Sequence, residues 1–220
     1  MNIKNGVFIL FFIWNYSING QTKWSFEFCG GAPYNMPSHI KIHQTGFNDL
    51  TISNAQFYSE PFALPPYWDW RFCQMKNNRI IELEAIHQKL YLSNKPPEIK
   101  RFSISHGFNM FFINYGKINK ANCIFRTGLG AVLTHPETEI RGYAFEDKGA
   151  FLNTIYYLSG PAINLSAGKR WYLIKRLYFN TEIKTTLAYV KIPVALGYAK
   201  VFTSSIQLVA GLGINFVSKE

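Results

Sequence analysis

The 220-residue sequence lacks any long uninterrupted apolar run, and it contains few charged residues and few cysteines. A membrane-spanning helix needs about 20 predominantly apolar residues, and no segment of the sequence has that character. Three cysteines permit at most one disulfide and exclude a small disulfide-stapled scaffold. The sequence also lacks a glycine-rich phosphate loop, a Walker motif and a zinc-ligand pattern, so no nucleotide, metal or other cofactor site is expected.

An export signal is present at the start of the sequence. Residues 1–6 carry one charge, Lys4, and residues 7–14 (VFILFFIW) form a short apolar stretch. The polar segment NYSING follows at residues 15–20. This three-part layout predicts a cleaved secretory signal peptide over residues 1–20, which leaves residues 21–220 as one exported domain.

Aromatic residues are abundant, with 19 Phe, 13 Tyr and 5 Trp, and the formal net charge is +10. An exported protein rarely meets nucleic acid, so we expect no nucleic-acid partner. Anionic lipid head groups, including those of lipopolysaccharide, are the partners that this charge favours.

The segment from Tyr198 to Asn215 alternates almost without a break. Its even-numbered positions from Phe202 to Ile214 are mostly apolar, whereas the odd-numbered positions are small or polar. Successive side chains of a strand point to opposite faces. The pattern therefore predicts a strand with one lipid-facing side, as in a membrane β-barrel.

Similar alternation recurs along the chain and predicts an all-β fold, an eight-stranded antiparallel up-and-down transmembrane β-barrel. A count of ten strands stays open if residues 49–58 form another hairpin arm. The links after the second, fourth and sixth strands are short and basic, so we expect them to face the periplasm; the long links 30–64 and 134–156 would then be external. The expected strands are 23–29, 66–75, 80–92, 100–115, 123–133, 157–167, 177–189 and 200–216.

Charged residues of both signs fall on inward positions of these strands. The lumen of an eight-stranded barrel is just wide enough for side chains. We therefore expect a network of salt bridges that fills the interior rather than an open pore. Its expected members are Asp69, Arg71, Glu82, Glu84, Arg126, Arg170, Glu182 and Lys184.

Two segments resemble those of a known family. GPAINLSAGKRWYL (Gly160–Leu173) and GLGINF (Gly211–Phe216) are similar to the later strands of the small outer-membrane β-barrel proteins of Gram-negative bacteria. The resemblance covers residues 66–216. It implies a barrel in the outer membrane, and it brings no catalytic residues with it.

His87 and His106 are the most conspicuous polar residues on the expected lipid face. A symmetric hairpin would place them opposite each other near the external end, with Lys89 beside them. We interpret all three as contacts to lipid head groups. Catalytic use of the two histidines is the alternative, since a histidine is a common general acid or base.

The function that these features favour is a non-enzymatic membrane platform whose loops 30–64 and 134–156 bind an external ligand or protein. An outer-leaflet lipid A acyl hydrolase or transferase is the first alternative, and a soluble lipocalin-like lipid binder is the second. Cys29 and Cys73 are expected on neighbouring strands but offset from each other, so pairing among Cys29, Cys73 and Cys123 stays open.

Overall fold

The computed structural model describes residues 22–146 and 156–216, so the expected signal peptide at residues 1–20 lies outside the described residues. The described residues form a 13-stranded sheet, and they contain no helix that could cross a membrane. The strands are β1 (Lys23–Asn35), β2 (Ser38–Gln44), β3 (Leu50–Ala55), β4 (Phe57–Tyr58), β5 (Trp68–Lys76), β6 (Arg79–Leu92), β7 (Ile99–Ile118), β8 (Cys123–Thr134), β9 (Glu137–Ile140), β10 (Tyr143–Ala144), β11 (Tyr157–Tyr172), β12 (Leu177–Val194) and β13 (Gly197–Phe216).

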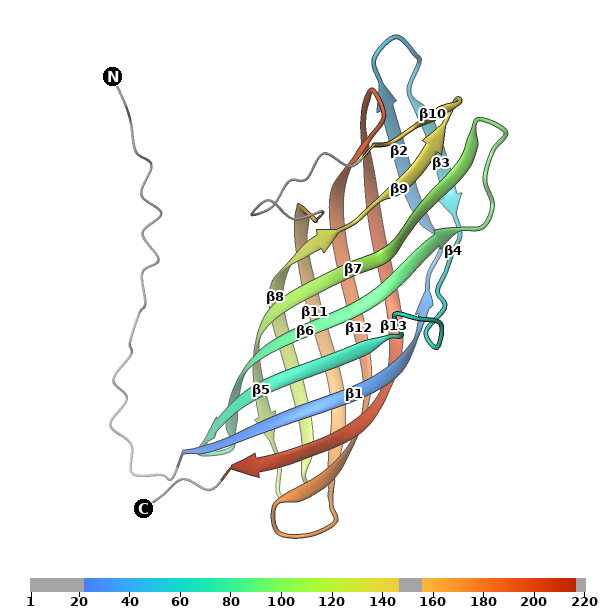
Figure 1. Cartoon of the computed structure of the whole chain (residues 1–220). Helices are drawn as coiled ribbons and strands as arrows, with labels where there is room; N and C mark the ends of the chain where they lie inside the picture. The colour runs from blue at the N-terminus through green and yellow to red at the C-terminus, as the bar shows by residue number, and fades with distance from the viewer. Residues whose placement is uncertain (1–21, 147–155, 217–220) are drawn as a thin grey trace, which may run out of the picture.

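Eight of these strands pair antiparallel in a cycle, which Figure 1 shows as a tilted barrel. The order of pairing is β1, β5, β6, β7, β8, β11, β12 and β13, and β13 pairs again with β1. The prediction of eight strands is confirmed. Residues 49–58 form no additional strand of this cycle, because β3 and β4 pair with β2 and β6 above it.

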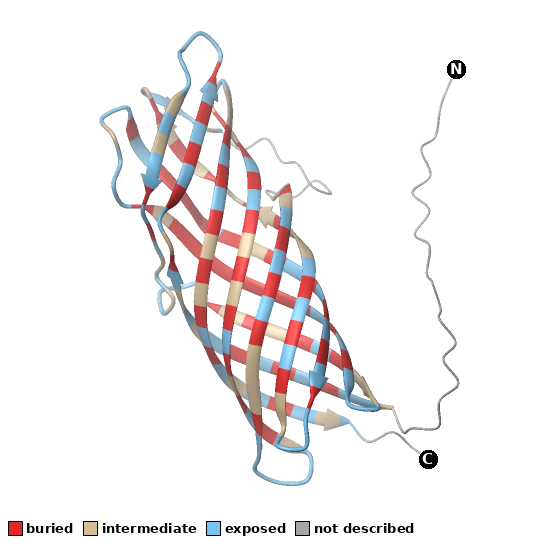
Figure 2. Ribbon diagram, turned by 180° about the vertical axis from the view of Figure 1, so that it is seen from behind, coloured by how far each residue is buried: buried red, intermediate tan, exposed pale blue. Residues whose placement is uncertain are grey.

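Burial alternates along the barrel strands, as the banding in Figure 2 shows. In β13, Phe202, Leu208 and Leu212 are exposed, whereas Ser205 and Gln207 are buried. The predicted faces of this strand are therefore confirmed. Because side chains alternate across a strand, the outward row is apolar while the inward row is small or polar.

The faces of β7 differ from the expectation for its external half. His106 was expected on the lipid side, and its alternate neighbours Ile104 and Phe108 would share that face, but both are buried inside the barrel wall. Phe111 and Ile113 point outward instead and are exposed. In the external half the even-numbered row is apolar apart from His106, and the odd-numbered row carries Ser103, Ser105 and Asn109. Because the interior at this level is an apolar core, the apolar row points inward, so apolar character does not identify the lipid face here.

The interior has two main regions along the barrel axis. The region towards the short turns, where β1 begins and β13 ends, is polar and charged, and at its turn end Cys73, Ile80, Ile118 and Ile124 form a small apolar cluster. The region near the opposite end is an apolar core of buried side chains. This core includes Ile40, Ile42, Ile86, Phe102, Phe108, Met110, Ile140, Val190, Ile192 and Val201.

The wall above β5 is completed by the segment that runs from β4 to the start of β5. β5 begins at Trp68, whereas its neighbours β1 and β6 continue to Asn35 and Leu92. Ser59 bridges them, because Asn35 Nδ2 donates to Ser59 Oγ (2.9 Å) and Ser59 Oγ donates to the Lys89 carbonyl (2.6 Å). Residues 57–67 therefore close the wall above β5.

The predicted long loop 30–64 is largely β-structure, which corrects the expectation. β1 continues to Asn35, and β2 extends the wall by pairing with β13 while β3 pairs with β2. On the other long link, 134–156, β9 pairs with β7 and β10 with β9, while residues 147–155 lie outside the described ranges. We call this paired extension beyond the barrel, β2, β3, β9 and β10, the outer rim (Figure 1).

The two halves of the outer rim touch at their tips. Arg141 Nη2 donates to the Asn48 carbonyl (2.9 Å), and the Arg141 guanidinium lies over the Phe47 ring at 4.9 Å. Tyr143 contacts the same ring, with 5.9 Å between ring centroids. The rim is therefore a folded continuation of the wall.

The three cysteines are free. Cys29 lies opposite Asp69, and Cys73 lies opposite Ser25. The two are thus offset along neighbouring strands, in agreement with the expected offset.

Closure between β1 and β13 can be tested by a disulfide. Ala32 and Leu208 are direct partners across this seam. Paired residues of antiparallel strands have Cα atoms about 4.5–5.5 Å apart. Because a disulfide needs a Cα–Cα distance of about 4.4–6.8 Å, cysteines at these two positions can form one. We expect Ala32→Cys/Leu208→Cys to cross-link under a lipophilic oxidant, as read by peptide mass spectrometry. The control Ala32→Cys/Ala210→Cys is off register by two residues and should cross-link weakly. Equal yields from the two variants would contradict the closed seam.

Candidate functional site

The polar region of the interior contains all eight charged residues predicted for the lumen. Their side chains come from five strands and are buried, each with 5% exposure or less. They converge because each occupies an inward position on its strand, so neighbouring strands aim their alternate side chains at the same axis. The residues are Asp69 and Arg71 on β5, Glu82 and Glu84 on β6, Arg126 on β8, Arg170 on β11, and Glu182 and Lys184 on β12.

Arg71 is the centre of this network. Its guanidinium contacts four carboxylates, at 3.0 Å to Glu27, 2.9 Å to Asp69, 2.9 Å to Glu84 and 2.8 Å to Glu182. The planar fork of arginine presents five N–H donors, which suits contacts in several directions at once. Arg71 thus links β1, β5, β6 and β12 across the lumen.

Three further basic side chains complete the network. Arg126 contacts Glu82 and Glu182, both at 2.7 Å. Arg170 contacts Glu27 at 2.6 Å. Lys184 contacts Asp69 at 2.5 Å and also contacts Glu84.

Glu27 belongs to this network but was missed in the sequence analysis. It receives contacts from Arg71 and Arg170 and a hydrogen bond from the Tyr178 hydroxyl (2.9 Å). Its position between Phe26 and Phe28, which are exposed, was the available signal. A carboxylate between two outward aromatic residues must point inward when successive side chains alternate.

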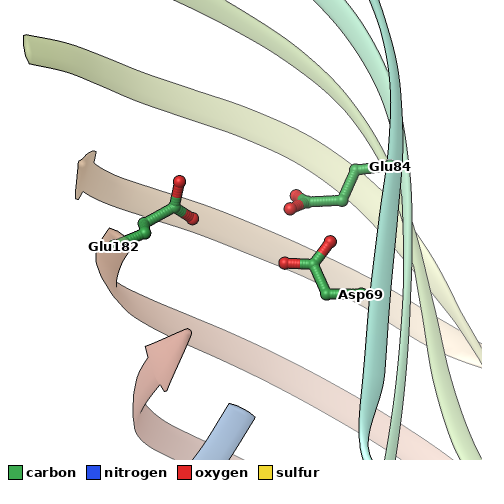
Figure 3. A group of neighbouring side chains, drawn as sticks. All are labelled: Asp69, Glu84 and Glu182. Atoms are coloured by element: carbon green, nitrogen blue, oxygen red, sulfur yellow. The ribbon is translucent and has the colours of Figure 1, made fainter. Parts of the chain in front are cut away.

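Three of the carboxylates lie close enough together to resemble a cation site. Figure 3 shows Asp69, Glu84 and Glu182 facing one another inside the barrel, with ligand atoms within 4.8 Å of each other. Arg71 and Lys184 contact all three carboxylates. The chain's own cations therefore supply the positive charge that a metal ion would bring to this cluster.

Neutral polar side chains continue the filling of the lumen. Asn114 and Asn164 both donate to Glu84, at 2.8 and 2.6 Å. Nearer the outer rim, the Tyr67 hydroxyl donates to Gln207 (2.7 Å), and the apolar core begins beyond this level. Buried side chains thus continue along the interior from the ion pairs to the rim.

The predicted head-group contacts of His87 and Lys89 are corrected by their burial. His87 is 4% exposed, stacks on Trp68 with 5.3 Å between ring centroids, and lies 2.7 Å from Asn109 Oδ1 through Nδ1. Lys89 is 5% exposed, and its ammonium donates to the carbonyls of Ala63 (3.1 Å) and Leu64 (3.0 Å). The segment that closes the wall above β5 covers both side chains.

His106 is not opposite His87, because the strands change register between them. His87 pairs with Asn109, and the shift between Gln88 and Leu90 leaves residues 105–107 of β7 in a bulge. A bulge inserts extra residues and turns a side chain to another direction. His106 is consequently exposed, with its Nδ1 2.5 Å from Glu137 Oε1.

The bulge also brings Ser105 against His106, since Ser105 Oγ lies 3.3 Å from His106 Nδ1. A serine, a histidine and a glutamate therefore meet at one place. In a catalytic triad the serine faces one ring nitrogen and the acid faces the other. Here both contacts are made to Nδ1, so the arrangement lacks the relay that would activate the serine.

A hollow of about 800 Å³ lies along the outside of the wall. Small residues produce it, because Gly30, Ala210 and Thr181 are direct neighbours across β1, β13 and β12. Its lining includes the exposed side chains of Ile183 and Leu208 and also Glu182 of the lumen network.

Comparison with known proteins agrees with this architecture. No protein-family model matches the sequence, and no curated protein matches it. Among solved structures, the outer membrane protein AlkL, determined by solid-state NMR in DMPC lipid bilayers, is similar, with a TM-score of 0.53 and 11% identity over 100% of both chains. The crystal structures of Neisserial surface protein A (NspA) and of Ail, the attachment invasion locus protein of Yersinia pestis, have TM-scores of 0.37 and 0.36. Each of the two is 9% identical in sequence, and each alignment covers 90% of this chain and 100% of the other protein's chain.

The likeness to AlkL concerns the fold, given the low identity. Together with the cycle of eight antiparallel strands, it defines the fold as that of the small outer-membrane β-barrel proteins. The predicted fold class is confirmed.

The Arg71 network predicts a large stability effect. Arg71→Met leaves buried carboxylates without their shared partner, and breaking a buried ion pair on one side costs about 3–5 kcal/mol. We expect the free energy of unfolding, from urea titration of the barrel in lipid vesicles, to fall by that amount. Arg79→Met, at the exposed first residue of β6, should change it by less than about 0.5 kcal/mol. Equal effects of the two variants would refute the central role of Arg71.

Proposed function

We propose that the protein is exported through its N-terminal signal and resides in the outer membrane of a Gram-negative bacterium. There it acts as a non-enzymatic platform whose external segments 30–64 and 134–156 bind a ligand or protein, and the outer rim, β2, β3, β9 and β10, is the described part of this surface. The observation that carries this proposal is the lumen, in which buried ion pairs and an apolar core fill the barrel.

The filled lumen separates a platform from a channel. Arg71 ties four strands together through the barrel axis, and the apolar core lies above it. A solute would have to displace paired charges, and leaving one charge unpaired in a buried site costs several kcal/mol. The interior therefore supports a role in which the barrel is a rigid anchor.

The outward surface supports insertion into a membrane. Phe28, Leu129, Leu165 and Leu208 are each more than 50% exposed and point away from the lumen. A soluble lipocalin-like barrel needs the reverse arrangement, with apolar residues lining the interior along its length. The charged interior opposes that alternative.

The outer rim supports the binding role because its strands are ordered beyond the eight-stranded ring. Its strands continue the wall by backbone pairing with β7 and β13, and its tips meet at Arg141 and Phe47. Binding residues are frequently carried by loops that a rigid scaffold positions. Here paired strands extend that scaffold to the tips.

The first prediction from this proposal concerns conductance. We expect the folded protein in planar lipid bilayers to give no ion conductance above the protein-free background, because the ion pairs block the lumen. Insertion is checked on the same preparation by the heat-dependent shift of a folded barrel in gel electrophoresis. Step-like channel openings from inserted protein would contradict the platform.

The second prediction addresses the enzymatic alternative at His106. We expect mass spectra of lipid A to be the same from outer membranes with and without the protein, since Ser105 and Glu137 contact the same nitrogen of His106. A shift by one acyl chain that His106→Ala abolishes would replace the platform with a lipid-modifying enzyme. His39→Ala, a histidine of the rim, serves as the matched control.

A further inference from the structure

Three lysines form a row across neighbouring strands where the outer rim meets the barrel. Lys200 on β13 lies directly opposite Lys41 on β2, and on its other side directly opposite Lys191 on β12. All three side chains are exposed. Directly opposed side chains on one face have Cβ atoms about 4.5–5.5 Å apart. We call Lys41, Lys200 and Lys191 the lysine row.

Like charges in direct opposition destabilise a sheet, and the chain balances this row only in part. Asp49 contacts Lys41 (2.9 Å) and His43 (2.8 Å) at the rim end. The hydrogen bonds from His43 and from Lys41 lower the pKa of the Asp49 carboxyl. Within the described residues, Lys191 and Lys200 have no carboxylate within ion-pair distance.

An aromatic ring lies beside these two lysines. The Lys191 ammonium is 4.0 Å from the centroid of the Tyr198 ring, and the Lys200 ammonium is 5.8 Å from it. A cation over an aromatic face is attracted to it. Tyr198 thus gathers the two ammonium groups on the outward surface, and neither has a partner carboxylate in the part of the chain that the structure describes.

The position of the row along the wall indicates the kind of anion. Tyr189 and Phe202 are opposite each other, two residues before Lys191 and two residues after Lys200, and they are 51% and 42% exposed. Below them the outward surface is apolar, with Ile183 and Leu208 exposed. Aromatic girdles mark the membrane interface of outer-membrane barrels. A row about 7 Å further along the strands then lies at the level of the lipid head groups.

We propose that the lysine row binds the phosphate of a phosphorylated lipid head group in the outer leaflet. This inference rests on the proposed insertion into the outer membrane. Lysine is a common phosphate ligand that acts as a point charge, and neighbouring ammonium groups at strand spacing converge on one phosphate. The basic row beside the aromatic pair favours a lipid over a free anion, since the apolar part of the same molecule would lie against Tyr189 and Phe202.

The test compares two double variants with the same change in charge. Lys191→Gln/Lys200→Gln removes two members of the row, and Lys117→Gln/Lys120→Gln removes two exposed lysines at the opposite end of the barrel. The probe is bis-phosphorylated lipid A added to the folded full-length protein in detergent, with bound lipid counted by native mass spectrometry. We expect binding to weaken about tenfold or more in the row variant, and by less than twofold in the control.

Two further probes identify the anion. Dephosphorylated lipid A should bind the unmodified protein about as weakly as lipid A binds the row variant. Inorganic phosphate at millimolar concentration should not displace lipid A. Equal binding of dephosphorylated lipid A, equal loss in both double variants, or displacement by inorganic phosphate would each overturn the proposal.

Asp49→Asn gives a test of opposite sign. It removes the carboxylate that competes for Lys41, so lipid A should bind more tightly, by a few fold. Unchanged or weaker binding would overturn the role of Lys41 in the site. Failure of the protein to insert into lipid vesicles would instead refute the proposed function, whereas an inserted protein that ignores lipid A refutes only the lysine row.

Discussion

The hydrogen-bonded seam between β1 and β13 is the constraint on which the rest of the structure depends. It joins the two ends of the barrel sheet, so the wall has a paired neighbour on both sides of its terminal strands. Within a bilayer an unpaired backbone edge costs several kcal/mol for each unsatisfied group. Closing eight strands into a ring also fixes the lumen at a width that side chains fill. The seam therefore determines both the outward apolar surface and the need for a packed interior.

The closed ring forces inward residues from all strands into a shared volume. Near the short turns the chain fills this volume with opposite charges, and Arg71 satisfies several carboxylates at once. Such a network is sensitive to the loss of any one partner, because the remaining charges have no access to water. Toward the rim the filling changes to aliphatic and aromatic side chains, which require no partners. Buried side chains thus fill the described interior along the barrel axis, which supports the platform proposal.

The outer rim uses the same backbone pairing beyond the barrel. β2 pairs with β13, which is far away in the chain, and this pairing brings Lys41 beside Lys200. The outward surface thereby carries a row of like charges in which, among the described residues, only Lys41 is paired with a carboxylate, that of Asp49. The histidines that stood out in the sequence have structural surroundings instead: His87 is buried under the segment that completes the wall, and His106 is held by Glu137 at a bulge.

The sequence by itself determined which face of a strand points outward where apolar residues alternate with polar or charged ones along the membrane-facing wall. The alternation in β13 identified its outward face, and the charged inward positions from Asp69 to Lys184 followed from the same periodicity. Only the tertiary structure decided the strands of segment 30–64, the orientation of the external half of β7, and the separation of His87 from His106. A period of two residues is a local property that the sequence records directly. Pairing partners and bulges depend on contacts between segments distant in the chain, which local periodicity does not encode.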